Sequence, residues 1–289
     1  MVLKSLHIPE SHLYVSEPPP NWFGNGANEL TNPLWTNSNW LKSRFHFSFA
    51  EYRNPKNTCF GVLRVMNDDL VQGNRGFGTH PHRDVEIVTY IVDGTLTHQD
   101  STGTRESLGR GSVQFMTAGT GIQHSEHNLE DGPLRFVQIW ITPRRTGLTP
   151  KYGGFDGTTA AAKAARTNAL AQLVGDDTQK EHAGAPVQIA SDCSMYVAEL
   201  ERGQTVDFAL RRGRQAYLLC VEGAVSAGGT ASDSGDDPPR ALVRHDAAEF
   251  RGEGSLRLTA GEAEGAHVLL LEMAEGAGGR GPGQWPLHL

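Results

Sequence analysis

The chain has 289 residues, a formal net charge of −7, and no apolar run near the ~20 residues that a membrane-spanning helix needs. Its basic residues form no cluster longer than the RRGR at 211–214, so the basic footprint of a nucleic-acid-binding protein is missing. We therefore expect neither a membrane protein nor a direct nucleic-acid binder. The length allows one large domain or two of roughly 130 residues each.

Three cysteines, Cys59, Cys193 and Cys220, lie far apart in the sequence. An odd number of widely spaced cysteines is typical of reduced thiols and not of a disulfide framework. The segment MVLKSLHIPESHLYV at 1–15 lacks the long apolar stretch and small residues of a secretory signal. We therefore expect an intracellular protein, in the cytoplasm, with the nucleus as the alternative compartment.

Short strands dominate the first half of the chain. Residues 59–71, 85–94, 112–118 and 134–141 are rich in Val, Ile and aromatic residues, which favour strands. Turn signals such as VDGT, LGRG and AGTG separate these segments. Short strands at this spacing predict an all-β sandwich or barrel.

The segment GGFDGTTAAAKAARTNA at 153–169 interrupts the strand pattern, and we expect a connection there with a short helix at 160–166. Strand-like segments resume after it, in the style of the first half. We therefore predict an N-terminal domain at 1–150, a linker and the start of the second domain at 151–180, and a C-terminal domain at 181–289.

Two histidines precede an apolar run in the sequence GFGTHPHRDVEIVTY at 76–90. In one continuous strand His80 and His82 project from the same face, because side chains alternate. Asp84 and Glu86 would share that face, which suggests a ligand-binding role. The opposite face would carry Val85, Ile87, Thr89 and Ile91.

A second polar pair follows in AGTGIQHSEHN at 118–128, where His124 and Glu126 are again two residues apart. Either pair alone is more often an ordinary surface feature, but two pairs on neighbouring strands can converge on one ion. Three neutral imidazoles and a carboxylate suit Fe(II), Mn, Ni, Cu(II) or Zn, and no thiolate favours a structural zinc site. Four protein ligands on an octahedral ion leave two positions for a substrate oxygen and O2.

These motifs resemble a known superfamily. The segment HPHRDVE at 80–86, followed by Gly94, resembles the first motif of the cupins, and GIQHSEHN at 121–128 resembles the second. More narrowly, the segments 76–101 and 116–128 resemble the pirin family.

The segments WLKSRFHFSFAEY at 40–52 and LRVMNDD at 63–69 resemble the bacterial branch of the pirins. The resemblance is dense over about 35–145 and mostly architectural beyond it. It implies a bicupin, with two jelly-roll-like β-barrel domains and a metal site only in the N-terminal one.

The resemblance also implies the ligand set, which comprises His80, His82, His124 and Glu126. In many other cupins the glutamate of the first motif, here Glu86, is a ligand, whereas pirin-like proteins use the glutamate of HSE. We favour Glu126 and expect Glu86 behind the ligands or in an ion pair. The expected cofactor is one divalent transition metal ion, Fe(II) first, with Ni, Cu, Mn, Co and Zn as alternatives.

Some pirins are similar in activity to quercetin 2,3-dioxygenase, which implies a flavonol-like aromatic substrate and O2. The resemblance implies that a bound metal would lower the pKa of the substrate's 3-hydroxyl, that Glu126 would take the proton as catalytic base, and that ring cleavage would release carbon monoxide. Phe77, Phe115 and Met116 flank the motifs and are candidate pocket walls, although such residues are usually core. His98 reads as a polar hairpin residue.

Other pirins are nuclear proteins that modulate transcription factors, with the metal as a redox-sensitive switch. This alternative function requires a protein partner and no direct contact with nucleic acid. A third interpretation keeps a metal-stabilised fold with another small-molecule substrate. The family resemblance also favours a monomer.

Overall fold

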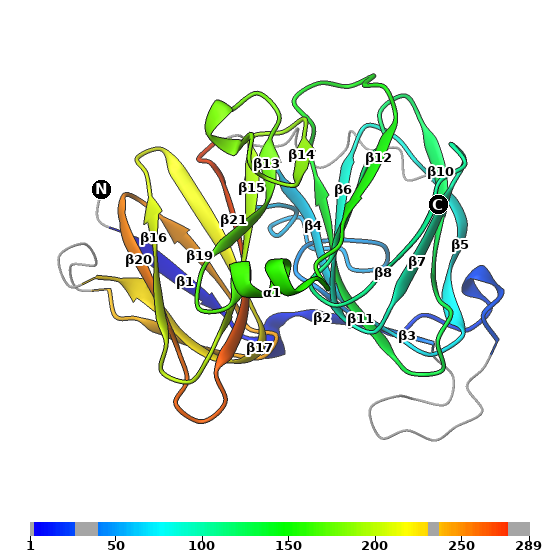
Figure 1. Cartoon of the computed structure of the whole chain (residues 1–289). Helices are drawn as coiled ribbons and strands as arrows, with labels where there is room; N and C mark the ends of the chain where they lie inside the picture. Colours follow the sequence, from blue (N-terminus) through cyan, green and yellow to red (C-terminus); the bar gives the residue numbers. More distant parts are fainter. Residues whose placement is uncertain (1–2, 27–39, 231–236, 277–289) are drawn as a thin grey trace. The chain divides into compact units, whose positions relative to one another are not determined.

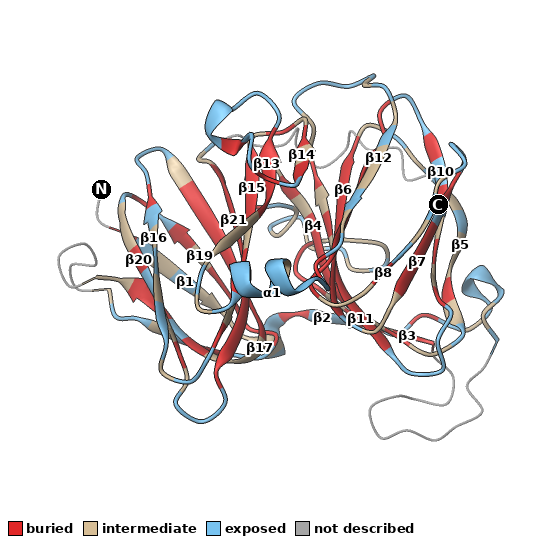
Figure 2. Cartoon of the chain, viewed as in Figure 1, coloured by how far each residue is buried: buried red, intermediate tan, exposed pale blue. Residues whose placement is uncertain are grey.

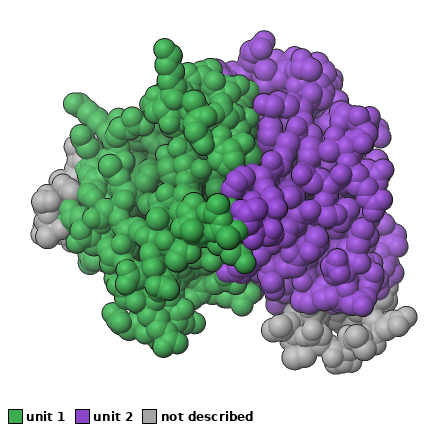
Figure 3. Space-filling model, in the orientation of Figure 1, with its two compact units in different colours: residues 1–13, 60–62, 160–278 green, residues 14–59, 63–159, 279–289 purple. Residues whose placement is uncertain are grey.

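The computed structural model describes residues 3–26, 40–230 and 237–276. The described chain divides into two compact units (Figure 3). Unit 1 comprises residues 1–13, 60–62 and 160–278, and unit 2 comprises residues 14–59, 63–159 and 279–289. Within the described ranges, no helix has the length and apolarity to cross a membrane.

Unit 2 consists of two antiparallel sheets, drawn mainly in cyan and green in Figure 1. The larger sheet has the order β12-β9-β6-β11-β4-β3-β2 and the smaller has the order β5-β10-β7-β8. The larger contains β2 (Tyr14–Ser16), β3 (Leu41–Phe45), β4 (Leu63–Val71), β6 (Glu86–Asp93), β9 (Val113–Thr117), β11 (Leu134–Ile141) and β12 (Lys151–Phe155). The smaller contains β5 (Arg75–His82), β7 (Leu96–Asp100), β8 (Arg105–Leu108) and β10 (Ile122–Asn128), and the short 3-10 helix η2 spans Trp22–Gly24.

The prediction of one continuous strand through 76–90 is wrong. Strand β5 ends at His82 and β6 begins at Glu86 in the other sheet. Asp84 turns the chain between them with a φ of 51°, and its carboxylate accepts a hydrogen bond of 2.7 Å from the Gly147 N–H. The alternation of side chains therefore restarts, and Thr89 joins the site described below instead of facing away from it.

The core of unit 2 is largely apolar, but it also encloses polar side chains, among them one ion pair. Trp40 and Phe136 are fully buried in it. Arg135 donates two hydrogen bonds, of 2.8 and 2.7 Å, to the carboxylate of Asp68 on the neighbouring strand. A buried ion pair is tolerated when the geometry is bidentate, because the hydrogen bonds offset part of the desolvation cost.

Unit 1 forms a ten-stranded sheet system whose main path is β1-β19-β17-β21-β15-β13-β14. Its elements are β1 (Lys4–Ile8), η1 (Glu10–His12), α1 (Ala160–Arg166), β13 (Ala171–Asp176), η3 (Lys180–His182), β14 (Val187–Ile189), β15 (Cys193–Leu200), β16 (Thr205–Leu210), β17 (Arg214–Gly229), β18 (Arg240–Val243), β19 (Ala247–Arg251), β20 (Gly254–Ala260) and β21 (Ala266–Ala274). The helix predicted at 160–166 is confirmed as α1.

The long strand β17 connects the two layers of unit 1. Its first part pairs with β19 and β21, and its last part pairs with β18 and β20. Gly223 lies at the change of partner with a φ of 71°, a conformation that glycine adopts without strain. Figure 2 shows β15, β17 and β21 as largely buried, in line with a core between the layers. The predicted all-β fold with two barrel-like domains is confirmed.

Candidate metal centre

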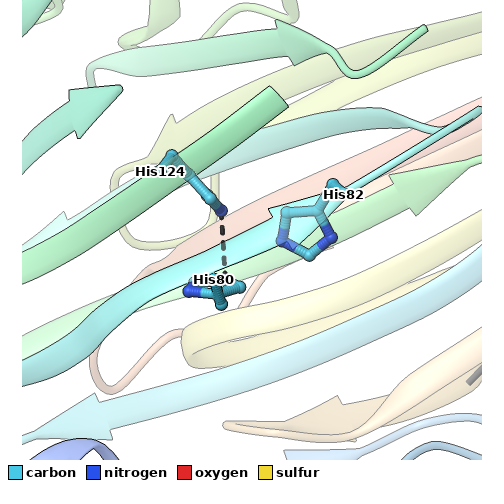
Figure 4. Close-up of side chains that lie close together, drawn as sticks. All are labelled: His80, His82 and His124. Atoms are coloured by element: carbon cyan, nitrogen blue, oxygen red, sulfur yellow. Dashed lines mark hydrogen bonds between the residues drawn. The ribbon is translucent and has the colours of Figure 1, made fainter. Parts of the chain in front are cut away.

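Three histidines meet on the inner face of the smaller sheet of unit 2 (Figure 4). His80 and His82 come from β5 and His124 from β10, where His124 lies directly opposite His80 in the antiparallel register. The ring centroids are 4.5 to 4.8 Å apart, and one nitrogen from each ring lies within 4.8 Å of the other two. The structure thus brings together three of the four predicted ligands in one group.

The hydrogen bond of His80 fixes its tautomer. Its Nδ1 lies 2.7 Å from the carbonyl oxygen of Gly78. A carbonyl oxygen only accepts hydrogen bonds, so Nδ1 carries the hydrogen and Nε2 of the neutral ring carries a lone pair.

The tautomer of His124 is fixed from the other side, through His98 and Asp100. His98 Nε2 lies 3.2 Å from Asp100 Oδ2, and because a carboxylate accepts, His98 Nε2 is the donor. His98 Nδ1 is then an acceptor for the Nδ1–H of His124, at 3.4 Å. The Nε2 of His124 is therefore left with a lone pair, as a metal ligand requires.

Two lone pairs consequently face each other across 3.1 Å, between Nε2 of His80 and Nε2 of His124. Neither atom has a hydrogen to donate when both rings are neutral, so the pair is repulsive unless a cation lies between the rings. Burial lowers the pKa of His80 and of His124, and it lowers the pKa of His82 to about 3, with the charge of His80 adding to the effect. The three rings are therefore neutral at pH 7, and this donor set fits a metal ion.

Glu126 belongs to a second, overlapping donor group with His98 and His124. It is 2% exposed, and burial raises its pKa to about 7. The hydrogen bonds that its carboxylate accepts oppose this rise, because they stabilise the charged form. They come from Gln138 Nε2 at 2.9 Å and from Gln114 Nε2, while the one hydrogen of Thr89 Oγ1 is shared between Glu126 at 3.3 Å and the Oε1 of Gln138 at 2.7 Å.

The three polar side chains around the Glu126 carboxylate form one row across the larger sheet. Thr89 on β6 pairs in register with Gln138 on β11 and with Gln114 on β9. The sequence analysis did not identify this row. Its signal is a single Gln within each of the apolar strands SVQFMTA and LRFVQIWI, which costs free energy unless the amide has a partner.

The remaining predicted residues differ in how they lie relative to the histidines. Phe77 lines a cleft beside the histidines, whereas Phe115 and Met116 line a narrow crevice beside His124 that has no room for a water-sized sphere. Glu86 is fully buried, accepts a 2.8 Å hydrogen bond from Thr117, and belongs to neither donor group. His98 lies in the β7–β8 hairpin but is 1% exposed, so its role beside His124 is not that of an ordinary polar hairpin residue.

The cleft in unit 2 opens onto the histidines and Glu126. The space in it that the centre of a water-sized sphere can reach is about 90 Å³, within an envelope of about 740 Å³ that includes open solvent. Trp140 packs edge-on against His82, with centroids 4.8 Å apart, and Phe23 lies 5.5 Å from His80. The aromatic walls suit a planar, apolar molecule that reaches the donor groups with a polar edge.

Two family models match the sequence. One described as Pirin matches residues 28–141, and one described as Quercetinase C-terminal cupin domain matches residues 178–273. A pirin-like protein of Caulobacter vibrioides is 37% identical over 235 residues, which cover 81% of this chain and 93% of the relative. The chain belongs to the pirin family.

Two other relatives from Escherichia coli carry more specific descriptions. A protein named quercetin 2,3-dioxygenase is 37% identical over 203 residues, covering 69% of this chain and 82% of that protein. The solved nickel(II) complex of a bacterial pirin aligns with a TM-score of 0.72 at 26% identity, covering 93% of this chain and 99% of that one. The pirin resemblance predicted from the sequence is therefore confirmed.

Proposed function

We propose that this pirin is a metal-dependent dioxygenase of the quercetin 2,3-dioxygenase type, acting on a flavonol-like aromatic substrate with O2. The observation that carries the proposal is the pair of opposed lone pairs on His80 and His124 beside an aromatic-lined cleft. The name of the E. coli relative supports the reaction type, because that relative matches most of this chain.

The proposed ligands are His80, His82, His124 and Glu126. Three neutral imidazoles and one carboxylate suit a first-row divalent ion of intermediate softness. We propose Fe(II), with nickel(II) as the alternative, because a related bacterial pirin has been solved in complex with nickel(II). The bound ion supplies Lewis acidity that lowers the pKa of a substrate hydroxyl group.

Glu126 acts as both oxygen ligand and catalytic base. Its carboxylate accepts the proton of the substrate's 3-hydroxyl in this proposal; in the metal-free protein, burial raises its pKa to about 7. The carboxylate is held in place by three side chains of the larger sheet, Gln138, Thr89 and Gln114. It therefore receives the proton at a fixed position. His98 and Asp100 keep His124 in the tautomer that binds the ion.

The cleft walls orient the substrate and exclude water from it. Trp140, Phe77 and Phe49 offer ring faces and edges for a planar molecule. An aromatic substrate with its hydroxyl edge toward the histidines therefore gains apolar burial along its length and metal contact at one end.

The test is oxygen uptake and carbon monoxide release with quercetin, measured on protein loaded separately with Fe(II) and with nickel(II). We expect turnover with at least one metal, and a loss of at least about a hundredfold in the His82→Ala variant, because removing a ligand loosens the ion. His12→Ala serves as the control, because His12 is an exposed histidine outside both donor groups. Absence of turnover with either metal, or unchanged turnover in His82→Ala, contradicts the proposal.

A further inference from the structure

The proposed reaction assigns no role to the segment NDD at 67–69 on β4. Alternation along the strand turns Asp68 toward Arg135 and places Asn67 and Asp69 on the other face, where both line the cleft. Asn67 pairs in register with Gln138, so it extends the polar row beneath Glu126 by one strand.

Asn67 is 4% exposed, and its Oδ1 atom is buried without a hydrogen-bond partner among the residues that the structure describes. A buried amide oxygen without a donor costs free energy. Because Asn67 lines the cleft, an O–H or N–H of water or of a bound molecule satisfies this acceptor, whereas a ligand carbonyl or carboxylate does not.

Asp69, two residues along the strand, is equally buried and accepts a hydrogen bond from Ser43 Oγ on β3. Burial raises the pKa of Asp69 to about 8, so the carboxyl group is mostly neutral at pH 7 and has an O–H to donate. An acceptor and a donor side by side match a hydroxyl group, which both donates and accepts.

We propose that Asn67 and Asp69, supported by Ser43, form a subsite that binds a ring hydroxyl of the aromatic substrate, separate from the hydroxyl that meets the metal. The proposal rests on the proposed function and makes it more specific, because the substrate class becomes a flavonol with at least one further ring hydroxyl. The surrounding aromatic walls contribute affinity to any flavonol, whereas this subsite discriminates among them.

The experiment compares two flavonols on nickel(II)-loaded protein without oxygen, so that binding is measured without turnover. Quercetin carries several ring hydroxyls, and 3-hydroxyflavone carries only the hydroxyl that meets the metal. The dissociation constants are measured by calorimetry for wild type, Asn67→Leu and Asn67→Ala, with unfolding temperatures to verify folding. Thr97→Val is the matched control, because it removes a partly buried 2.8 Å contact with Ser107 within unit 2 but outside the cleft.

We expect both Asn67 variants to bind quercetin about tenfold more weakly while binding 3-hydroxyflavone within about twofold of wild type. Thr97→Val should change neither constant. Equal weakening for both flavonols, unchanged quercetin affinity in both Asn67 variants, or failure of wild type to bind quercetin would overturn the subsite. Discriminating binding by a protein that never consumes oxygen would instead contradict the oxygenase and leave the subsite standing.

Discussion

His98 and His124 face each other through their Nδ1 atoms at 3.4 Å, and only one of the two carries a hydrogen. Asp100 determines which one, because its carboxylate takes the Nε2–H of His98 at 3.2 Å. The carboxylate itself is held by the turn that follows, where its Oδ1 accepts hydrogen bonds from Thr102 N at 2.8 Å and Thr102 Oγ1 at 2.6 Å. The turn that holds Asp100 thus determines which nitrogen of His124 carries the lone pair.

The Asp100→Asn variant should reverse this tautomer chain. The turn keeps an amide oxygen at the Oδ1 position, so the NH₂ group faces His98 and forces its Nε2 to accept. His124 then carries its hydrogen on Nε2, and we expect metal affinity to fall about 10- to 100-fold. Imidazole ¹⁵N shifts of the metal-free protein should show the change directly.

Asp93→Asn is the control for Asp100→Asn, because Asp93 is exposed at the end of β6. If Asp100→Asn binds the metal as tightly as wild type does and keeps the Nδ1–H tautomer of His124, the tautomer assignment is wrong.

Removing Gln138 should move the pH profile of activity. Its amide stabilises the charged form of Glu126 through a 2.9 Å hydrogen bond, so Gln138→Leu raises the pKa of that carboxyl group. A base must be ionised to act, and the acidic limb of the kcat profile should therefore move to higher pH. The exposed Gln99→Leu should keep the wild-type profile. An unchanged or acid-shifted limb in Gln138→Leu would argue against Glu126 as the base.

Asp69 should make the metal-free protein less stable as the pH rises. Burial raises its pKa from 3.8 to about 8, against the hydrogen bond from Ser43 and with the charges of Asp68 and Glu126 adding to the rise. Between these values the folded state holds a proton that the unfolded chain has lost, so the free energy of unfolding falls as pH rises through this window.

The Asp69→Asn variant should flatten that dependence by an amount on the order of a few kcal/mol between about pH 4 and 8. The raised pKa of Glu126 acts in the same direction, whereas the lowered pKa values of His80, His82 and His124 act in the opposite direction below about pH 6.5, so the effect of Asp69 is the difference between the two proteins. Urea unfolding at a series of pH values measures the difference. Parallel curves for wild type and Asp69→Asn would show that Asp69 titrates normally.

Gly76 is required where β5 meets β10. A Cβ atom at this position would lie 2.4 Å from the backbone oxygen of Glu126 and 2.7 Å from the Cα of His127. Gly76→Ala should push the strands apart, cost about 2–4 kcal/mol of unfolding free energy and weaken metal binding. Gly132→Ala is the control, because its added Cβ meets nothing within 4 Å. Equal stability of the two variants would contradict this register.

The sequence predicts the histidine cluster because the residues that form it lie in two short motifs. His80 and His82 alternate on one strand, and the motif with His124 fixes the second strand, so three donors converge without knowledge of the rest. The turn at Asp84 was missed because a non-glycine residue at positive φ leaves no composition signal, and the run beyond it looks like the same strand.

The polar row beneath Glu126 could not be predicted for a different reason. Gln114 and Gln138 come from strands far apart in the sequence, and only the pairing of β9, β6 and β11 brings them together. Strand register is set by long-range packing, which a single sequence does not display. The partner of His98 was hidden in the same way, because β7 meets β10 only in the folded sheet.

The central claim is that the facing lone pairs of His80 and His124 hold a divalent transition metal. Elemental analysis of natively purified wild type and of the His80→Ala/His124→Ala double variant tests it most directly. The account predicts about one ion per chain in wild type, because the two donor groups share His124, and almost none in the folded double variant. A metal-free wild type from metal-replete cells, or equal metal content in the two proteins, would contradict it.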